Sequence, residues 1–390
     1  MRLLHTSDWH LGHILYNNER VREQADMLRQ MADIVREEQP DLFLLCGDVY
    51  HTAQPSAAVQ RMFAEGMMQI HEACPEMRIV VTAGNHDSAS RHDIFHTPWL
   101  RHNVITIGAV DKDDPESLII DVPGKAFVIA VPYCNERSMP EGLFQQLLDA
   151  VEQRNTAQLP VVMMAHTTVD GCIRVGHDNA TDREVGGIES LSISELGSGY
   201  DYLALGHVHC KQFVHTGHHN VRYSGTPLPV SFDEDFEHTV SIVEIAAHGD
   251  RPEVKEVPIR NPRPLVTLPR PGEAFATWDE ARAALQQFPD DNPAYIRLNV
   301  EVDDYLPAEA KGEAEQIAAE KSCRFCLINA VRKVSADAAT AQALSVQEFR
   351  VTHPKEIAKR YLESVGVTFD EEMEAVFDEA CRLIDEEERI

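Results

Sequence analysis

Five short segments of the chain each place metal-binding side chains directly after an apolar run of strand length. They read TSDWHLG, CGDVYHT, AGNHDS, MAHTT and LGHVHC. The carboxylates, imidazoles and amide that they offer are Asp8, His10, Asp48, Asn85, His166, His207 and His209. Seven ligands are too many for one ion, but they suit two divalent ions roughly 3.5–4 Å apart that share a bridging carboxylate.

The mixture of ligand types indicates the chemistry of such a site. Imidazole together with carboxylate and amide favours manganese, iron or zinc over magnesium. A structural zinc site would instead be closed, tetrahedral and usually rich in cysteine. Two catalytic cations would withdraw charge from a phosphodiester and lower the pKa of a bound water toward neutrality, which makes hydroxide available for in-line attack.

Strand geometry explains how distant segments can supply one site. Side chains at i and i+2 of an extended segment point the same way, so we expect Asp8 and His10 to reach one region, and His207 and His209 likewise. In open α/β sheets, ligands gather at the carboxyl ends of the strands. Each of the five segments stands at such an end, so the sheet is predicted to assemble the site.

Residues 1 to about 260 alternate between strand and helix patterns, which predicts a layered α/β domain. The expected strands are Arg2–Thr6, Asp41–Cys46, Arg78–Ala83, Leu118–Val122, Lys125–Val131, Val161–Ala165 and Asp201–Leu205. Apolar spacing indicates helices across 21–35 and 59–70, and turn residues indicate antiparallel ribbons at 213–232 and 238–259.

A proline-rich join, IRNPRPLVTLPRPGE, predicts a domain boundary near residue 262. Beyond it, the pattern predicts a small α+β domain with a helix around 278–288, a strand at 295–302, a helix around 308–321 and a strand at 325–334. We therefore divide the chain into residues 1–262, residues 263–335, a linker at 336–344 and a helical segment at 345–390.

Length and composition are typical of an ordinary globular chain. Its 390 residues are 43% apolar and 25% charged, and no apolar run approaches the roughly 18 residues that span a membrane. The N-terminal apolar stretch is too short for a signal peptide, so we expect a cytoplasmic protein. The net charge of −29 argues against a general electrostatic grip on nucleic acid.

Two other clusters favour structural explanations. The eight cysteines are scattered, as is usual for reduced thiols in a core. The pair Cys323 and Cys326 lacks a second pair or nearby histidines, so packing is favoured over a zinc or redox site. The histidine-rich HTGHHN at 215–220 falls at a turn, and we expect a solvated loop there.

In order along the chain, Asp-x-His, Gly-Asp, Gly-Asn-His-Asp, a strand-end His and Gly-His-x-His resemble the motifs of the calcineurin-like metallophosphoesterases. The longer segments HTSDWHLG, GDVYHTAQPS, GNHDS, LGHVH and YSGTPLPVSFDE are similar to those of the recombination and repair nucleases of that family, which act with an SbcC-type ABC ATPase. The resemblance covers the whole chain, more weakly after residue 262. It implies a β-sandwich flanked by helices, a small α+β capping domain and a C-terminal helical tail.

The resemblance also implies a role for each candidate residue. One Mn²⁺ would be held by Asp8, His10 and His209, a second by Asn85, His166 and His207, and Asp48 would bridge them. His86 would face the scissile phosphate and protonate the leaving oxygen, since imidazole titrates in the right range. His51 resembles a second non-ligand histidine near the phosphate, at a position where some bacterial members carry aspartate.

The implied function is that of a metal-dependent DNA nuclease subunit acting on DNA ends and hairpins in repair and recombination, with ATP-dependent double-strand exonuclease and single-strand endonuclease activity. The alternative is a small-molecule or cyclic-nucleotide phosphodiesterase or phosphatase with the same centre. The Ser/Thr phosphatase branch is disfavoured because GDVYHTAQPS lacks its Asp-Arg-Gly. A non-catalytic scaffold is disfavoured because the ligand set is complete. The sequence has no Walker-A motif, so ATP use would belong to a partner.

The segment at 345–390 is the candidate contact with that ATPase. Apolar residues form stripes on its two expected helices, a pattern that fits packing on the chain's own domain equally well. The resemblance implies docking on the base of the SbcC coiled coil, and a homodimer within a heterotetramer. Candidate dimer segments are the helix at 55–72 and HDIFHTPWL, although the methionines of the former also suit a core.

Overall fold

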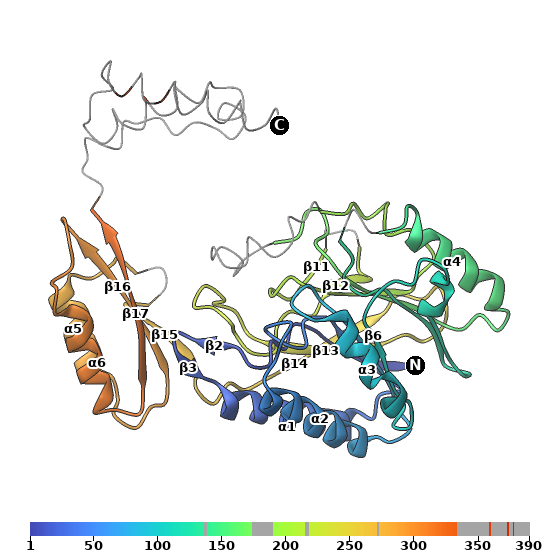
Figure 1. Cartoon of the computed structure of the whole chain (residues 1–390), viewed down its shortest axis with the longest axis horizontal. Coiled ribbons are helices and arrows are strands. Elements are labelled where there is room, and N and C mark those ends of the chain that lie inside the picture. The colour runs from blue at the N-terminus through green and yellow to red at the C-terminus, as the bar shows by residue number, and fades with distance from the viewer. Residues whose placement is uncertain are drawn as a thin grey trace. The chain divides into compact units, whose positions relative to one another are not determined.

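The computed structural model of the chain describes residues 1–135, 139–173, 190–214, 218–270 and 273–333, with Lys359, Met373 and Phe377 (Figure 1). The chain divides into two compact units, Met1–Val300 with Ala308–Asn329, and Glu301–Pro307 with Ala330–Ile390. All candidate site residues lie in the first unit. Among the described residues, no helix combines the length and the apolar character that a bilayer crossing requires.

Two six-stranded sheets dominate the first unit. The first has the order β14-β13-β1-β4-β5-β6, with β1 Arg2–Thr6, β4 Leu42–Cys46, β5 Arg78–Thr82, β6 Val104–Ile107, β13 Thr239–Glu244 and β14 Glu253–Pro258. The second has the order β11-β12-β10-β9-β8-β7, with β7 Ile119–Val122, β8 Ala126–Ala130, β9 Val161–His166, β10 Tyr202–Gly206, β11 Gln212–Phe213 and β12 Val221–Tyr223. Within each sheet, the strands that lead to the candidate ligands run parallel to one another, so their carboxyl ends share one edge.

The two sheets pack face to face, and helices cover their outer faces (Figure 1). Alternation along β4 shows why its residues are all apolar. Leu42 and Leu44 face Val162 of the second sheet. Phe43 and Leu45 face the helices α1 (Val21–Glu38) and α2 (Ala57–Ala73). The helices α3 (Ala89–Leu100) and α4 (Leu143–Arg154) add to the first and second outer layers, respectively.

The predicted α/β layers are confirmed, and the expected strands of the first 260 residues differ only at their ends. Leu118 is a correction: it lies in a short 3-10 turn, η1 (Pro115–Leu118), and β7 begins after it. The ribbon expected at 213–232 is also wrong beyond Tyr223, because residues 224–238 form a loop around prolines that cannot extend a strand ladder. The ribbon of β13 and β14 is confirmed.

A small sheet follows, with β15 (Leu265–Leu268), β16 (Tyr295–Val302) and β17 (Arg324–Arg332) in that order. The helices α5 (Trp278–Gln287) and α6 (Ala310–Ala319) accompany it, and α5 begins with a capping box between Thr277 and Glu280. The expected alternation of helices and strands is present, with β15 in addition. The expected linker at 336–344 lies outside the described residues, as does the helical segment at 345–390 apart from the three residues named above.

A short hairpin of β2 (Ile14–Leu15) and β3 (Asn18–Glu19) lies between β1 and α1 in the chain. In the HTGHHN segment, His218 and His219 are exposed, which agrees with a solvated loop, and residues 215–217 lie outside the described residues. Cys323 is buried just before β17, Cys326 is half-buried within β17, and neither belongs to a cluster of metal-binding groups among the described residues.

Candidate metal centre

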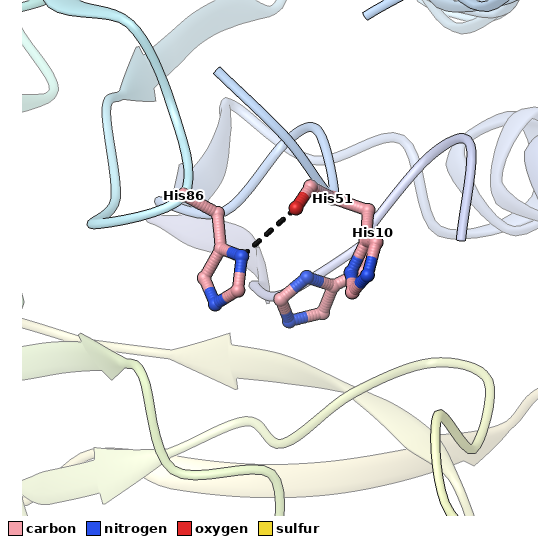
Figure 2. A group of neighbouring side chains, drawn as sticks. All are labelled: His10, His51 and His86. Atoms are coloured by element: carbon pink, nitrogen blue, oxygen red, sulfur yellow. Dashed lines mark hydrogen bonds between the residues drawn. The ribbon is translucent and has the colours of Figure 1, made fainter. Parts of the chain in front are cut away.

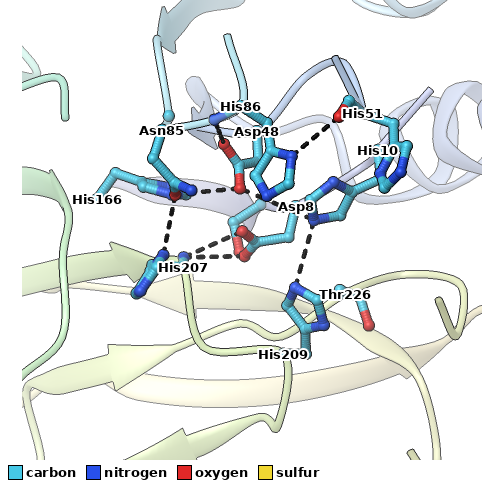
Figure 3. A network of polar contacts seen from close by, with 12 residues as sticks. Asp8, His10, Asp48, His51, Asn85, His86, His166, His207, His209 and Thr226 are labelled. Atoms are coloured by element: carbon cyan, nitrogen blue, oxygen red, sulfur yellow. Dashed lines mark hydrogen bonds and ion pairs between the residues drawn. The ribbon is translucent and has the colours of Figure 1, made fainter. Parts of the chain in front are cut away.

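The candidate residues from all five segments meet at the carboxyl ends of the central strands of both sheets (Figure 3). The ligand atoms of Asp8, His10 and His209 lie within 4.8 Å of one another, and so do those of Asp48, His166 and His207. Asn85 joins the second group, because its Oδ1 lies 3.0 Å from His166 Nε2 and 3.0 Å from His207 Nδ1. The structure therefore brings all seven predicted ligands together in two adjacent groups.

The backbone reaches this geometry differently from the extended segment that the sequence suggested. Asp8, His10, Asp48 and His207 all have positive φ, at 54°, 43°, 50° and 91°. Such left-handed conformations are costly for residues other than glycine and gather at functional sites. The expectation that His207 and His209 reach one region is wrong, because the turn at His207 sends the two rings into different groups.

Asp48 lies between the two groups. Its Oδ2 is 3.8 Å from His10 Nε2 and 3.4 Å from His166 Nε2, while its Oδ1 accepts the backbone N–H of His86 at 2.9 Å. Burial would raise the pKa of Asp48, but the neighbouring His166 and His10 hold it well below its usual range. Asp48 thus presents a charged oxygen to both groups of ligands.

Two glycines make room for these side chains. A Cβ on Gly84 would collide with the carboxylate of Asp48, and a Cβ on Gly47 would collide with the ring of His166. Gly47 also has a φ of 83°, which L side chains rarely adopt. The close approach of backbone to ligand therefore requires glycine at both positions.

Hydrogen bonds at Nδ1 fix the orientation of several rings. Nδ1 of His166 lies 2.8 Å from the Cys46 carbonyl oxygen, and Nδ1 of His209 lies 2.9 Å from Oε1 of Glu234. Because these oxygens only accept, each Nδ1 carries a proton, which leaves Nε2 as the ring nitrogen that would bind a metal. Both Nε2 atoms face the two groups, as metal ligands require.

The donor atoms fit a cation. Nε2 of His166 faces Oδ1 of Asn85 and Oδ2 of Asp48, so three lone-pair atoms converge. Although burial opposes protonation, the carboxylate of Asp48 raises the pKa of His166 to about 9, so this position favours a positive charge. Nε2 of His209 likewise faces His10 Nε2 at 3.3 Å. A divalent cation in each group would satisfy these atoms.

His86 and His51 are not among the seven predicted ligands, but with His10 they form a third group whose ring nitrogens lie within 4.8 Å of one another (Figure 2). The ring of His86 lies 4.9 Å from the ring of His10 and stacks on His51 at 5.5 Å. Nδ1 of His86 donates to the backbone carbonyl of His51 at 2.9 Å. Burial lowers the pKa of His51 to about 4, so its ring is neutral near pH 7.

Two further residues belong to the surroundings of the centre, and motif spacing does not indicate either. The ring of His13 lies 4.6 Å from that of His51. Glu234 accepts from His209, and it lies in the loop at 224–238. The only sequence signal for Glu234 is its place in YSGTPLPVSFDE, which resembles a family segment without assigning it a role.

The paired sheets and the two groups of carboxylate, imidazole and amide ligands define a metallophosphoesterase, a class of hydrolases. The family model described as calcineurin-like phosphoesterase matches residues 1–211, and one described as type 5 capsule protein repressor C-terminal domain matches residues 261–365. The SbcD subunit of the SbcCD nuclease from Bacillus subtilis is 30% identical over 334 residues, which cover 79% of this chain and 81% of that protein. The SbcD subunit from Rhodobacter capsulatus is 30% identical over 305 residues, covering 70% of this chain and 73% of that protein.

The chain therefore belongs to the SbcD family of calcineurin-like phosphoesterases. Among solved structures, a dimetal phosphatase from Danio rerio aligns with 67% of this chain and 99% of its own, at 12% identity and a TM-score of 0.40.

Proposed function

We propose that this chain is a metal-dependent DNA nuclease that hydrolyses phosphodiester bonds in a complex with an SbcC-type ABC ATPase. The observation that carries the proposal is the meeting of two ligand groups at Oδ2 of Asp48. The names of the relatives, which are nucleases of SbcCD complexes, support DNA as the substrate. ATP-dependent exonuclease action on double strands and endonuclease action on single strands belong to the same proposal.

Each of the two ligand groups would hold one divalent cation. Asp8, His10 and His209 would hold one, Asn85, His166 and His207 the other, and Asp48 both. The mixture of oxygen and imidazole ligands supports Mn²⁺ at each position. When bound, the two ions would withdraw charge from the phosphodiester and lower the pKa of a water molecule.

The chain's own residues orient these ligands and supply a proton. The backbone N–H of His207 donates to the carboxylate of Asp8, and the N–H of His86 donates to that of Asp48, so both carboxylates are fixed before a metal arrives. The Nδ1–H of His86 donates to the carbonyl of His51, and in the imidazolium form the second proton, on Nε2, would pass to the departing alkoxide oxygen and leave a neutral ring. The neutral ring of His51, stacked on His86, would border the phosphate.

The proposal also covers the domains of the chain and its assembly with partners. Residues 1–262 would form the nuclease domain and residues 263–335 a capping domain, joined by the linker at 336–344 to a segment at 345–390 that docks on the ATPase. The nuclease chains would pair as a homodimer within a heterotetramer, in the cytoplasm. A partner that contributes DNA contacts would explain how a chain of net charge −29 acts on DNA.

The second candidate function is hydrolysis of small or cyclic phosphodiesters by the same centre. The second matched family model, at 261–365, favours the nuclease, because a small-molecule enzyme needs no such addition. The test compares linear duplex DNA, hairpin DNA and bis-p-nitrophenyl phosphate as substrates of the Mn²⁺-loaded full chain, with and without the ATPase and ATP. Cleavage of DNA that ATP and the ATPase stimulate is expected. Cleavage of the small ester alone, with every DNA left intact, would contradict the proposal.

A further inference from the structure

Glu234 is a buried carboxylate beside the centre, and the roles proposed above leave it without a task. It is 5% exposed. Its Oε1 lies 2.9 Å from Nδ1 of His209, and its Oε2 accepts the Thr226 hydroxyl at 3.1 Å and the backbone N–H of Val230 at 3.3 Å. Both carboxylate oxygens therefore accept hydrogen bonds, and one of them accepts from a candidate metal ligand.

The loop at 224–238 holds Glu234 rigidly. The guanidinium of Arg20 donates to the carbonyl of Pro229, and that of Arg297 donates to the carbonyl of Phe232 at 3.2 Å. Arg297 also pairs with the carboxylate of Asp233 at 2.6 Å. These contacts reach the loop from separate parts of the chain, so the position of the Glu234 carboxylate does not depend on its contact with His209 alone.

The corresponding contact in the other ligand group is different. Nδ1 of His166 donates to a neutral backbone carbonyl, that of Cys46, whereas Nδ1 of His209 donates to a carboxylate. A carboxylate behind an imidazole makes the opposite nitrogen a stronger donor to a metal. The first group also contains Asp8 as a carboxylate of its own, while Asn85 contributes only a neutral amide to the second.

We propose that Glu234 is a positioning residue that fixes His209 with Nε2 toward the metal and makes the Asp8, His10 and His209 group the tighter of two unequal cation sites. The inference rests on the proposed division of the ligands between two ions. It predicts that the first cation to bind enters this group and that the second, in the Asn85, His166 and His207 group, is bound more weakly.

The test is a calorimetric titration of Mn²⁺ into the metal-free full chain, which needs no substrate. The natural chain should show one tight and one weaker site. Glu234→Gln keeps the shape and an oxygen for the His209 N–H but removes the charge, so it should weaken the tight site about 10–100-fold and leave the weaker one in place. Asn85→Ala should do the opposite and weaken only the second site. Glu237→Gln, an exposed carboxylate of the same loop, is the matched control and should leave both unchanged.

Thermal unfolding in EDTA separates positioning from folding. Without metal, Glu234→Gln should have a melting temperature near that of the natural chain. On adding Mn²⁺, its melting temperature should rise less than that of the natural chain. Glu234→Asp, which keeps the charge, should recover part of that rise. Equal weakening of both sites, an unchanged tight site, or a natural chain with two equal sites would overturn the inference. A natural chain that binds two unequal ions but cleaves no DNA would contradict the proposed function and leave this inference standing. Failure to bind two ions would overturn both.

Discussion

The backbone N–H of His207 donates to both carboxylate oxygens of Asp8, at 3.0 and 3.1 Å. Asp8 follows a strand of the first sheet and His207 a strand of the second, so this contact ties the two sheets together at the centre. The carboxylate of Asp8 is therefore oriented by a main-chain N–H, which no side-chain substitution removes. The geometry of the centre therefore depends on how the sheets pack as well as on the ligands themselves.

Removal of His86 should separate metal binding from proton transfer. We expect His86→Ala to retain both cations, because both proposed ligand sets are complete without His86, and to lose about 10²–10⁴-fold in turnover of DNA. Bis-p-nitrophenyl phosphate has a leaving group that needs no proton, so its turnover should fall much less. Metal content and rates on both substrates check this. Loss of an ion, or equal losses on the two substrates, would show that the role of His86 is misassigned.

Asp48→Asn should weaken both cation sites together. Oδ2 of Asp48 faces His10 and His166, and its charge is shared between the groups, so a neutral amide removes an anionic ligand from each. Titration with Mn²⁺ measures the two affinities, and Asp201→Asn, a buried carboxylate remote from the centre, controls for loss of a buried charge. If only one site weakens in Asp48→Asn, then Asp48 does not bind both cations.

Gly84→Ala should impair the centre through a collision. The added methyl group meets the carboxylate of Asp48, so the strand end must shift, at a cost of about 1–3 kcal/mol in the free energy of unfolding and with a loss of Mn²⁺ affinity. Gly312→Ala is the control, since its Cβ would meet open space within α6 and a helix gains from alanine. Urea unfolding and metal titration test both variants. Gly84→Ala with natural stability and affinity would mean that the backbone there is free to adjust.

The unfolding free energy should depend on pH through His5, which lies buried between the sheets. Burial lowers the pKa of His5 to about 3, and its neutral ring contacts the Tyr202 hydroxyl at 3.0 Å and the Leu205 carbonyl at 3.2 Å. The unfolded chain binds a proton there below about pH 6.5 and the folded chain does not, so the stabilising contribution is complete above pH 6.5 and is lost as the pH falls toward 3.

One unit below pH 6.5 this loss reaches about 1.4 kcal/mol. In EDTA, the free energy of unfolding of the natural chain, measured with urea, should therefore fall by about 1.4 kcal/mol more than that of His5→Gln between pH 7.5 and 5.5. The exposed His219→Gln should lose as much as the natural chain. The same pH dependence in His5→Gln as in the natural chain would argue against a neutral buried His5.

Deletion of residues 345–390 tests the proposed docking segment. The shortened chain should keep Mn²⁺-dependent cleavage of simple DNA ends, because every ligand lies before residue 210, and should lose stimulation by ATP and the ATPase. Co-purification with the ATPase and rates with and without ATP are the measurements. A shortened chain that still binds the ATPase would place the contact elsewhere.

The ligand set is predictable because it is recognised from the types of residues and their order along the chain, and both can be read without side-chain positions. Asp8 and Asn85 could be assigned to one edge because the carboxyl ends of parallel strands meet there. The helix α4 was detectable in principle, since Leu147 and Val151 stand at helical spacing, whereas β6 has only four residues, too few for a pattern.

The surroundings of the centre are not predictable in the same way. The left-handed backbone at Asp48 and His207 is a property of the folded turn and has no signature in residues that are not glycine. Glu234 meets His209 across a long proline-containing loop, and only the fold determines which acidic residue of that loop turns inward. Spacing therefore identifies the ligands, and tertiary contacts identify what orients them.

Anomalous scattering from a crystal of the full chain soaked in Mn²⁺ tests most directly whether two cations share Asp48. We expect two peaks, one on each side of Oδ2 of Asp48, the first against His10 and His209 and the second against His166 and His207. A single peak, or none at these side chains, would contradict this expectation.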